Sequence, residues 1–197
     1  AVLSFSDGCK WLTETPISID EYQYWTRLKA DGLTDMGEAF QELSSKLSRK
    51  EFLKSPSLSY APVIFLLSDG AATDDVRTGL KVLKNNRWYK YGMKISLGIG
   101  EHYDREILEE FTGNIELVFE AKTAEQLSRI IKTIAVTSSQ IGSKSVTLVN
   151  DDNLKYWTEE DVMGDKEKRL IEEINKSWED ENDGPVDEFD VDDGWDN

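Results

Sequence analysis

The chain has 197 residues, of which 39% are hydrophobic and 10% aromatic, so it is long enough and apolar enough to form one globular domain with a core. Its formal net charge of −16 argues against nucleic-acid binding, because DNA and RNA are polyanions that associate with basic surfaces. The single cysteine, Cys9, excludes an intramolecular disulfide, and no apolar run reaches the roughly 20 residues of a membrane span, so we expect a cytoplasmic protein that is not bound to a membrane.

Acidic residues gather at the C-terminal end of the sequence. From Ser177 onward there is no Lys or Arg, and the acidic residues there account for ten of the sixteen net negative charges. Such a segment repels itself and has little apolar surface to bury, so we predict a solvated, disordered tail over residues 179–197. The tail would attract cations or the basic surface of a partner.

Segments typical of strands alternate with segments typical of helices, which predicts an α/β fold with parallel strands and covering helices. Two short strands are expected first, over residues 2–6 and 10–17, joined as a hairpin through Asp7 and Gly8. Pro16 would end the second strand.

A helix and a buried strand follow. Thr34 is expected to cap a helix over residues 34–49. The continuous apolar run over residues 62–67 predicts a central parallel strand that is covered on both faces, and it leads into Asp69 and Gly70. The helix would bury four residues at helical spacing, namely Met36, Phe40, Leu43 and Leu47.

The next part of the chain continues the alternation. Asp74 and Asp75 suit the N-terminus of a helix, where a negative charge meets the positive end of the helix dipole. The buried stripe of this helix would hold Val76, Leu80, Leu83 and Trp88. Beyond it the pattern predicts strands over residues 93–99 and 115–119 and helices over residues 104–111 and 123–139, the last with Leu127, Ile130, Ile131 and Ile134 inward.

The pattern changes after Gly142. Residues 145–149 are expected to form one more strand, and residues 158–178 a helix that Thr158 caps. Its apolar stripe would hold Leu170, Ile171, Ile174 and Trp178. We therefore divide the chain into a domain over residues 1–141, an extension over residues 142–178 and the acidic tail over residues 179–197.

A resemblance to a known family rests on short segments that occur in a fixed order. The segments are Val2-Leu3-Ser4-Phe5-Ser6, Gly32-Leu33-Thr34-Asp35-Met36-Gly37, Phe65-Leu66-Leu67-Ser68-Asp69-Gly70 with Thr73-Asp74-Asp75, and Ser96-Leu97-Gly98-Ile99-Gly100. With these segments the chain resembles, over roughly residues 1–140, the von Willebrand factor type A (vWA) domain, and most of all its bacterial tellurium-resistance-associated branch.

The resemblance implies a doubly wound, mostly parallel sheet with helices on both faces, a vWA or Rossmann-like fold with its site at the carboxyl ends of the strands. In the family this is a metal-ion-dependent adhesion site. A divalent cation is held there by an Asp-x-Ser-x-Ser loop, by a Thr from a second loop and by an Asp from a third. Thr34 matches the Thr and Asp69 matches the third-loop Asp, so the resemblance implies these two as ligands for Mg2+ or Mn2+.

The chain departs from the family pattern at its N-terminal end. No Asp-x-Ser-x-Ser loop occurs in the sequence, and the match begins at the family's second strand, so the usual first strand is expected to be lacking. Because Mg2+ prefers near-octahedral oxygen coordination, one hydroxyl and one carboxylate would hold it only weakly. Residues 145–149, or another part of a longer gene product, would have to fill the place of the first strand.

Simpler roles are open for the same residues. Thr34 is a good helix cap without any metal, and Asp69 before Gly70 suits an ordinary turn. Ser68 and Asp35 would either support the ligands or be exposed to solvent.

Other reactive residues form no recognisable site. His102 lies in a polar loop without a second His or a Cys for zinc, and no Ser-His-Asp order is present. Cys9 has no visible base to activate it. Residues 190–194 lack the spacing of an EF-hand, and neither a Gly-x-Gly-x-x-Gly motif after a strand nor a phosphate loop occurs, so nucleotide binding is not expected.

These observations favour a non-enzymatic protein-interaction module. The resemblance implies that an acidic side chain of a protein partner completes the coordination of the cation, in a bacterial stress response akin to tellurium resistance. Two alternatives remain open: a metal-independent scaffold that uses its surface and its acidic tail, and a hydrolase that uses Asp69. A further hypothesis is that a carboxylate of the tail occupies the cation site and blocks it.

Overall fold

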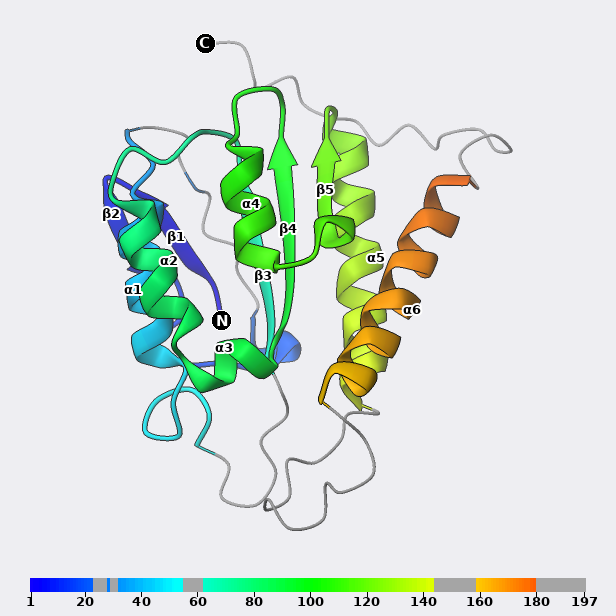
Figure 1. The fold of residues 1–197 in the computed structure, drawn as a ribbon, viewed down its shortest axis with the longest axis horizontal. Helices are drawn as coiled ribbons and strands as arrows, with labels where there is room; N and C mark the ends of the chain where they lie inside the picture. Colours follow the sequence, from blue (N-terminus) through cyan, green and yellow to red (C-terminus); the bar gives the residue numbers. More distant parts are fainter. Residues whose placement is uncertain (23–27, 29–31, 55–61, 144–158, 180–197) are drawn as a thin grey trace.

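The computed structural model describes residues 1–22, 28, 32–54, 62–143 and 159–179. In this part the chain is an α/β protein with a three-stranded parallel sheet, a separate two-stranded hairpin and helices on both faces of the parallel sheet (Figure 1). None of the described helices combines the length and the apolar character needed to cross a membrane. The strand expected over residues 145–149 and the tail after position 179 lie outside the described residues.

The hairpin at the start of the chain is tighter than expected. Strands β1 (Leu3–Ser6) and β2 (Gly8–Trp11) pair antiparallel, with Ser6 opposite Gly8. A hairpin is confirmed, but the placement of its second strand over residues 10–17 is wrong. Gly8 lies in the left-handed region at φ 79°, which lets the chain reverse at once and begin pairing two residues earlier.

The parallel sheet has the strand order β3 (Val63–Ser68), β4 (Met93–Ile99), β5 (Val118–Ala121). The strand predicted over residues 93–99 is confirmed with the expected bounds. The run over residues 62–67 is also a strand, but it lies at an edge of the described sheet and not at its centre. Its side chains are apolar on both faces because helices cover both faces of the sheet.

The last strand begins later than the sequence suggested. Ile115–Leu117 form a 3-10 turn, η2, because the side chain of Asn114 accepts a hydrogen bond from the backbone N–H of Glu116 at 3.0 Å. The strand predicted over residues 115–119 is therefore wrong in its first half.

Helices fill most of the remaining described chain. The helices predicted over residues 104–111 and 158–178 are confirmed to within one residue at each end. The helix predicted after Asp75 is interrupted, so that a short separate helix follows it. The bounds are η1 (Ile19–Glu21), α1 (Met36–Lys46), α2 (Val76–Lys84), α3 (Arg87–Tyr91), α4 (Arg105–Thr112), α5 (Ala124–Ser143) and α6 (Glu159–Glu179).

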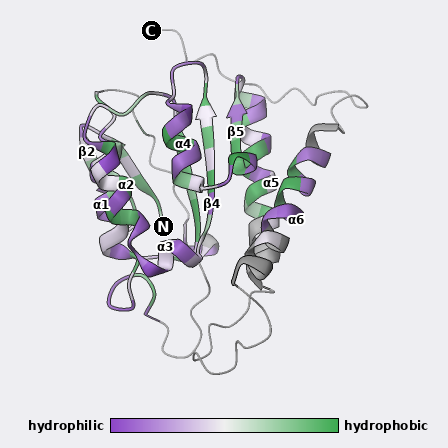
Figure 2. Ribbon diagram, viewed as in Figure 1, coloured by the Kyte–Doolittle hydropathy of each residue, from purple (hydrophilic) through white to green (hydrophobic). Residues whose placement is uncertain are grey.

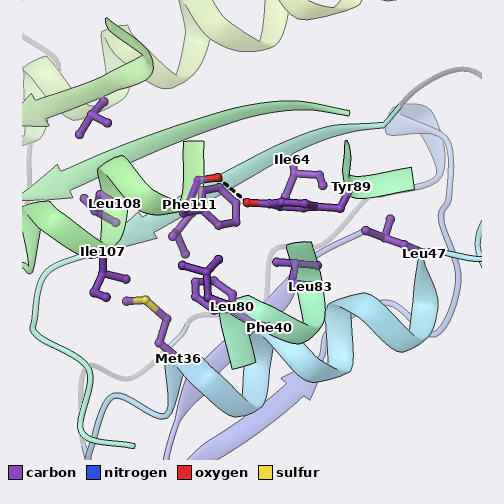
Figure 3. Packing of buried hydrophobic residues seen from close by; sticks show 12 residues of the cluster. Met36, Phe40, Leu47, Ile64, Leu80, Leu83, Tyr89, Ile107, Leu108 and Phe111 are labelled. Atoms are coloured by element: carbon purple, nitrogen blue, oxygen red, sulfur yellow. Dashed lines mark hydrogen bonds between the residues drawn. The ribbon is translucent and has the colours of Figure 1, made fainter. Parts of the chain in front are cut away.

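One hydrophobic cluster lies between the sheet and helices α1 to α4 (Figure 3). Phe40 of α1 stacks on Phe111 of α4, with ring centroids 5.5 Å apart. The buried hydroxyl of Tyr89 donates a hydrogen bond to the carbonyl of Phe111. Phe5 of β1 packs against the same cluster, so the hairpin and the parallel sheet share one core.

A second cluster lies on the opposite face of the sheet, under α5 and α6. Leu170 and Ile174 of α6 have no exposed surface, so this helix completes the core. Ile130 and Ile134 of α5 are buried as predicted, but Ile131 is 37% exposed, because it lies about 100° around the helix from Ile130. Figure 2 shows the resulting mixture of hydrophobic and hydrophilic residues along the helices.

Helices α1 and α2 cross at glycines. A Cβ added at Gly79 would overlap the carbonyl oxygen of Gly37, and one added at Gly37 would lie 2.6 Å from the carbonyl oxygen of Asp75. The two backbones touch directly, which only glycine permits at these positions. This contact fixes the loop before α1 against the loop before α2.

Candidate functional site at the carboxyl ends of the strands

Three loops meet where β1 and β3 end: the turn between β1 and β2, residues 32–35 before α1, and residues 69–75 before α2. Asp69 directly follows β3. The hydroxyl oxygen of Thr34 lies 3.3 Å from the point that a Cβ on Gly70 would occupy. The structure therefore places the two predicted ligand residues at the same edge of the molecule.

The side chains of Thr34 and Asp69 are accessible and available to bind a ligand. Asp69 is exposed, and Thr34 is half-buried. Neither side chain forms a hydrogen bond or an ion pair within the described part of the chain. An exposed carboxylate and a nearby free hydroxyl are thus available for a ligand.

Thr34 does not cap helix α1, so that prediction is wrong. The helix begins at Met36, and Thr34 uses its backbone and not its hydroxyl to hold the loop. Its N–H donates to Oγ1 of Thr73 at 2.9 Å, and its carbonyl accepts from the N–H of Thr73 at 3.0 Å. This pair of bonds joins the loop before α1 to the loop after β3.

The cap of α1 comes from Asp74. Its two carboxylate oxygens accept hydrogen bonds from the backbone N–H groups of Gly37, at 2.9 Å, and Glu38, at 2.8 Å. Asp74 does precede α2, but its carboxylate bonds to α1, whereas Asp75 accepts a bond from the N–H of Thr78 and caps α2. No local sequence pattern marks a cap that lies 37 positions from its helix.

Two further aspartates tie the hairpin turn to the loop before α1. Asp35 accepts hydrogen bonds from the N–H of Gly8 at 2.7 Å and from the hydroxyl of Thr73 at 3.3 Å. Asp7 accepts a bond from the N–H of Leu33 at 2.9 Å. Asp35 is therefore a structural link between loops and is not an exposed residue with a free carboxylate.

Ser68 shapes the turn that presents Asp69. Its side chain is buried, and its hydroxyl donates to the carbonyl of Gly70 at 2.8 Å. This bond closes a tight turn around Asp69, so the exposed carboxylate sits on a fixed backbone.

The oxygens of Thr34 and Asp69 are of the type that binds a hard divalent cation, but two ligands are too few to complete its coordination. Hydroxyl and carboxylate oxygens are ligands that Mg2+ and Mn2+ prefer. Within the described residues, no group of three or more His, Cys, Asp or Glu side chains is placed to hold a metal ion. The carboxylates of Asp7, Asp35 and Asp74 already accept hydrogen bonds. A cation at Thr34 and Asp69 would need water and a partner molecule to complete its shell.

The residues considered for other chemistry do not form a site. The pKa of Cys9 is raised to about 11 by partial burial and by the nearby carboxylates of Glu38 and Glu42, so its thiol stays protonated at neutral pH. His102 is exposed in its loop, as expected.

Comparison with solved structures shows a likeness in fold, whereas the sequence comparisons found no match. No family model matches the chain, and no curated protein matches it. Among solved structures, proximal thread matrix protein 1 from the mussel byssus is similar, with a TM-score of 0.53 and 20% sequence identity. The similarity covers 67% of this chain and 35% of that chain, so this chain spans about a third of its length. At this identity the likeness shows the fold alone.

Proposed function

We propose that this chain is a non-enzymatic protein-interaction module that binds a partner at the carboxyl ends of its strands, with Mg2+ or Mn2+ held by Thr34 and Asp69. One observation carries the proposal. These two side chains share an edge and are open, whereas the aspartates around them are used to join the loops. A preformed frame with open oxygens suits binding, because little order has to be gained when a partner arrives.

The chain's own residues have distinct tasks in this proposal. Asp69 would bind the cation through its exposed carboxylate, and Thr34 through its hydroxyl. A bound cation supplies a positive charge that attracts a carboxylate of the partner. Leu33, which is 57% exposed beside Thr34, would add an apolar contact to the same partner.

The finer fold assignment belongs to the same proposal. We infer that the hairpin and the parallel sheet are two parts of a doubly wound, vWA-like sheet that lacks its usual first strand. In the described residues β1 and β3 belong to different sheets and do not pair with each other, although their side chains share one core. This arrangement supports a missing strand between them. The resemblance on which this rests also suggests a cytoplasmic role in a stress response akin to tellurium resistance.

A second candidate is a scaffold that binds its partner without metal. The loops are already held by backbone N–H groups that donate hydrogen bonds to Asp7, Asp35 and Asp74, so the edge keeps its shape with no cation. In that case the carboxylates at the edge would attract a basic partner, and binding would weaken with salt but not with chelator.

Thermal unfolding with and without metal tests the first candidate. With a Kd of about 1 mM, about 10 mM Mg2+ or Mn2+ would stabilise the folded chain by about 1.4 kcal/mol and raise Tm by a few degrees relative to chelator. Asp69→Asn should lose this rise. Glu116→Gln is the matched control, because it removes an exposed carboxylate from η2, which precedes β5 at the opposite end of the sheet.

Either of two results would refute the cation site. One is a wild-type Tm that is the same in metal and in chelator, which would favour the metal-independent scaffold. The other is a metal-dependent rise that persists unchanged in Asp69→Asn, which would place the bound cation elsewhere.

A further inference from the structure

The basic residues of this acidic chain are distributed unevenly. Residues 76–100 contain six Lys or Arg side chains and no acidic residue, although the whole chain carries a net charge of −16. Most of this segment forms α2, α3 and β4. The stretch of chain that forms these three elements is therefore positively charged.

Two of these cations are paired with acids, and a third is half-buried. Arg77 forms an ion pair with Glu106 at 2.8 Å, and Lys84 pairs with Glu110 at 2.9 Å, so both join α2 to α4. Lys94 is half-buried, with its ammonium 5.4 Å from the ring centroid of Tyr89.

The other three cations are exposed and unpaired with acids. Lys81 of α2 and Arg87 and Lys90 of α3 are exposed, and none of them forms an ion pair within the described part of the chain. The guanidinium of Arg87 lies over the ring of Tyr91, at 5.5 Å from its centroid. We call these three residues the basic surface.

Helix stability accounts for part of this arrangement only. Lys81 lies in the last turn of α2, where a positive charge is favourable against the helix dipole. Arg87 is the first residue of α3, where the dipole disfavours a positive charge. Lys90 is three positions after Arg87, so the two side chains emerge on the same side of α3.

We propose that the basic surface binds the chain's own acidic C-terminal segment, residues 180–197. That segment contains nine Asp or Glu residues and no Lys or Arg, so its charge is opposite to that of the basic surface. The edge with Thr34 and Asp69 is the poorer target for it, because the carboxylates of Asp7, Asp35 and Asp74 surround that edge and repel an acidic segment.

The length of the segment allows this contact within one molecule. Helix α6 ends at Glu179, and the 18 residues that follow span up to about 60 Å when extended. A folded body of this size has a diameter of about 40 Å and measures about 60 Å around half of its circumference, so the extended segment is long enough to reach the basic surface. In this proposal the interaction holds the acidic segment away from the edge with Thr34 and Asp69. It does not depend on whether a cation binds at that edge.

The test uses the full chain with a nitroxide spin label near its end. Cys9→Ser removes the native thiol and Val191→Cys carries the label, so that amide signals of nearby residues broaden in NMR spectra. At about 20 mM salt, amides over residues 81–90 should lose more than half of their intensity, and at about 500 mM salt they should recover because the charges are screened.

A charge-reversed variant tests the surface itself. Lys81→Glu, Arg87→Glu and Lys90→Glu together should abolish the broadening. The matched control reverses three other exposed lysines with Lys10→Glu, Lys50→Glu and Lys132→Glu, which gives the same change in net charge and should leave the broadening intact. Thermal melts of both variants establish that they are folded.

Several results would overturn the proposal. The first is the absence of broadening over residues 81–90 at low salt. The second is equal loss of broadening in the two triple variants, because the effect would then follow net charge and not the basic surface. The third is broadening in a mixture of spin-labelled chains with separate isotope-labelled chains, because a second copy would then supply the acidic segment.

Discussion

At the scale of single residues, the aspartates at the carboxyl ends of the strands are of two kinds. Asp7, Asp35 and Asp74 hold loops through hydrogen bonds, whereas the carboxylate of Asp69 is exposed and available for a ligand. Asp74 is the clearest of the first kind, because both of its oxygens serve the start of a helix that precedes it by more than thirty positions. Such a cap supplies two acceptors for N–H groups that no helical bond satisfies.

Removing this cap gives the first prediction. Asp74→Ala should lower the free energy of unfolding by about 1–2 kcal/mol, measured by urea denaturation, because Gly37 and Glu38 lose their acceptors. Asp20→Ala, an exposed aspartate of η1, should change it by less than about 0.5 kcal/mol. Equal effects of the two substitutions would contradict the assigned role of Asp74.

Tyr89 gives a prediction about pH. Burial, with a smaller contribution from the nearby carboxylate of Glu110, raises the pKa of Tyr89 far above its ordinary value. The unfolded chain loses this proton near pH 10 while the folded chain keeps it, so stability is present below pH 10 and falls as the pH rises above about 10.

The pH dependence of the free energy of unfolding is compared between the wild type and Tyr89→Phe. This variant should lose about 1 kcal/mol at neutral pH, because the bond to the Phe111 carbonyl is absent, and should show a smaller further loss between about pH 9 and pH 11 than the wild type. Tyr91→Phe, at a partly exposed tyrosine, serves as the control and should retain the full alkaline loss. Parallel pH profiles for wild type and Tyr89→Phe would be evidence against this account.

At the scale of elements, the crossing of α1 and α2 sets the geometry of the edge. Gly79→Ala should destabilise the chain by about 3 kcal/mol or more, because the new methyl group would overlap the backbone of Gly37 and force the helices apart. Gly164→Ala in α6 is the matched control: no atom lies within 4 Å of the added Cβ, so it should stabilise by about 0.5–1 kcal/mol. Denaturant titration gives the free energy of unfolding of both variants. A Gly79→Ala variant as stable as the wild type would refute the close crossing.

Helix α6 gives a second prediction at this scale. Leu170→Ala should cost about 2–5 kcal/mol, because it leaves a cavity in the cluster beneath α5 and α6. Ile131→Ala on α5 should cost clearly less, since that side chain is partly exposed. If both cost equally little in chemical denaturation, α6 would not be part of the cooperative core.

The sequence predicted those elements whose signals are local. The apolar run of β4 has its expected bounds, and Asp104 begins α4 as a cap should. The failures came where distant residues decide: Thr34 looked like a cap, but Asp74 provides it. The start of β5 was missed for a different, local reason, because Asn114 accepts a bond from the N–H of Glu116 and turns the chain into η2 before β5 can begin. Hydrogen bonds between loops leave no periodic pattern, so sequence reasoning had no signal for them.

At the scale of the whole molecule, two β units are joined by one core and by three loops. Phe5 of β1 packs against the cluster that also holds side chains of β3, and the loops at the ends of the two strands are linked by Asp7, Asp35 and Thr73. The order of strands and loops in the sequence was enough to predict that Thr34 and Asp69 lie at one edge. It was not enough to reveal which of the surrounding carboxylates are already engaged.

The most direct test of the cation site is a titration of the full chain with Mn2+, followed through the EPR signal of the free ion. The account predicts one weak site with a Kd of about 1 mM that weakens at least about tenfold in Asp69→Asn and in Thr34→Val, but not in Glu116→Gln. All four proteins keep the acidic C-terminal segment, so its own affinity for Mn2+ cancels in the comparison. Identical titration curves for the four proteins would contradict the claim that Thr34 and Asp69 form the binding edge for a cation.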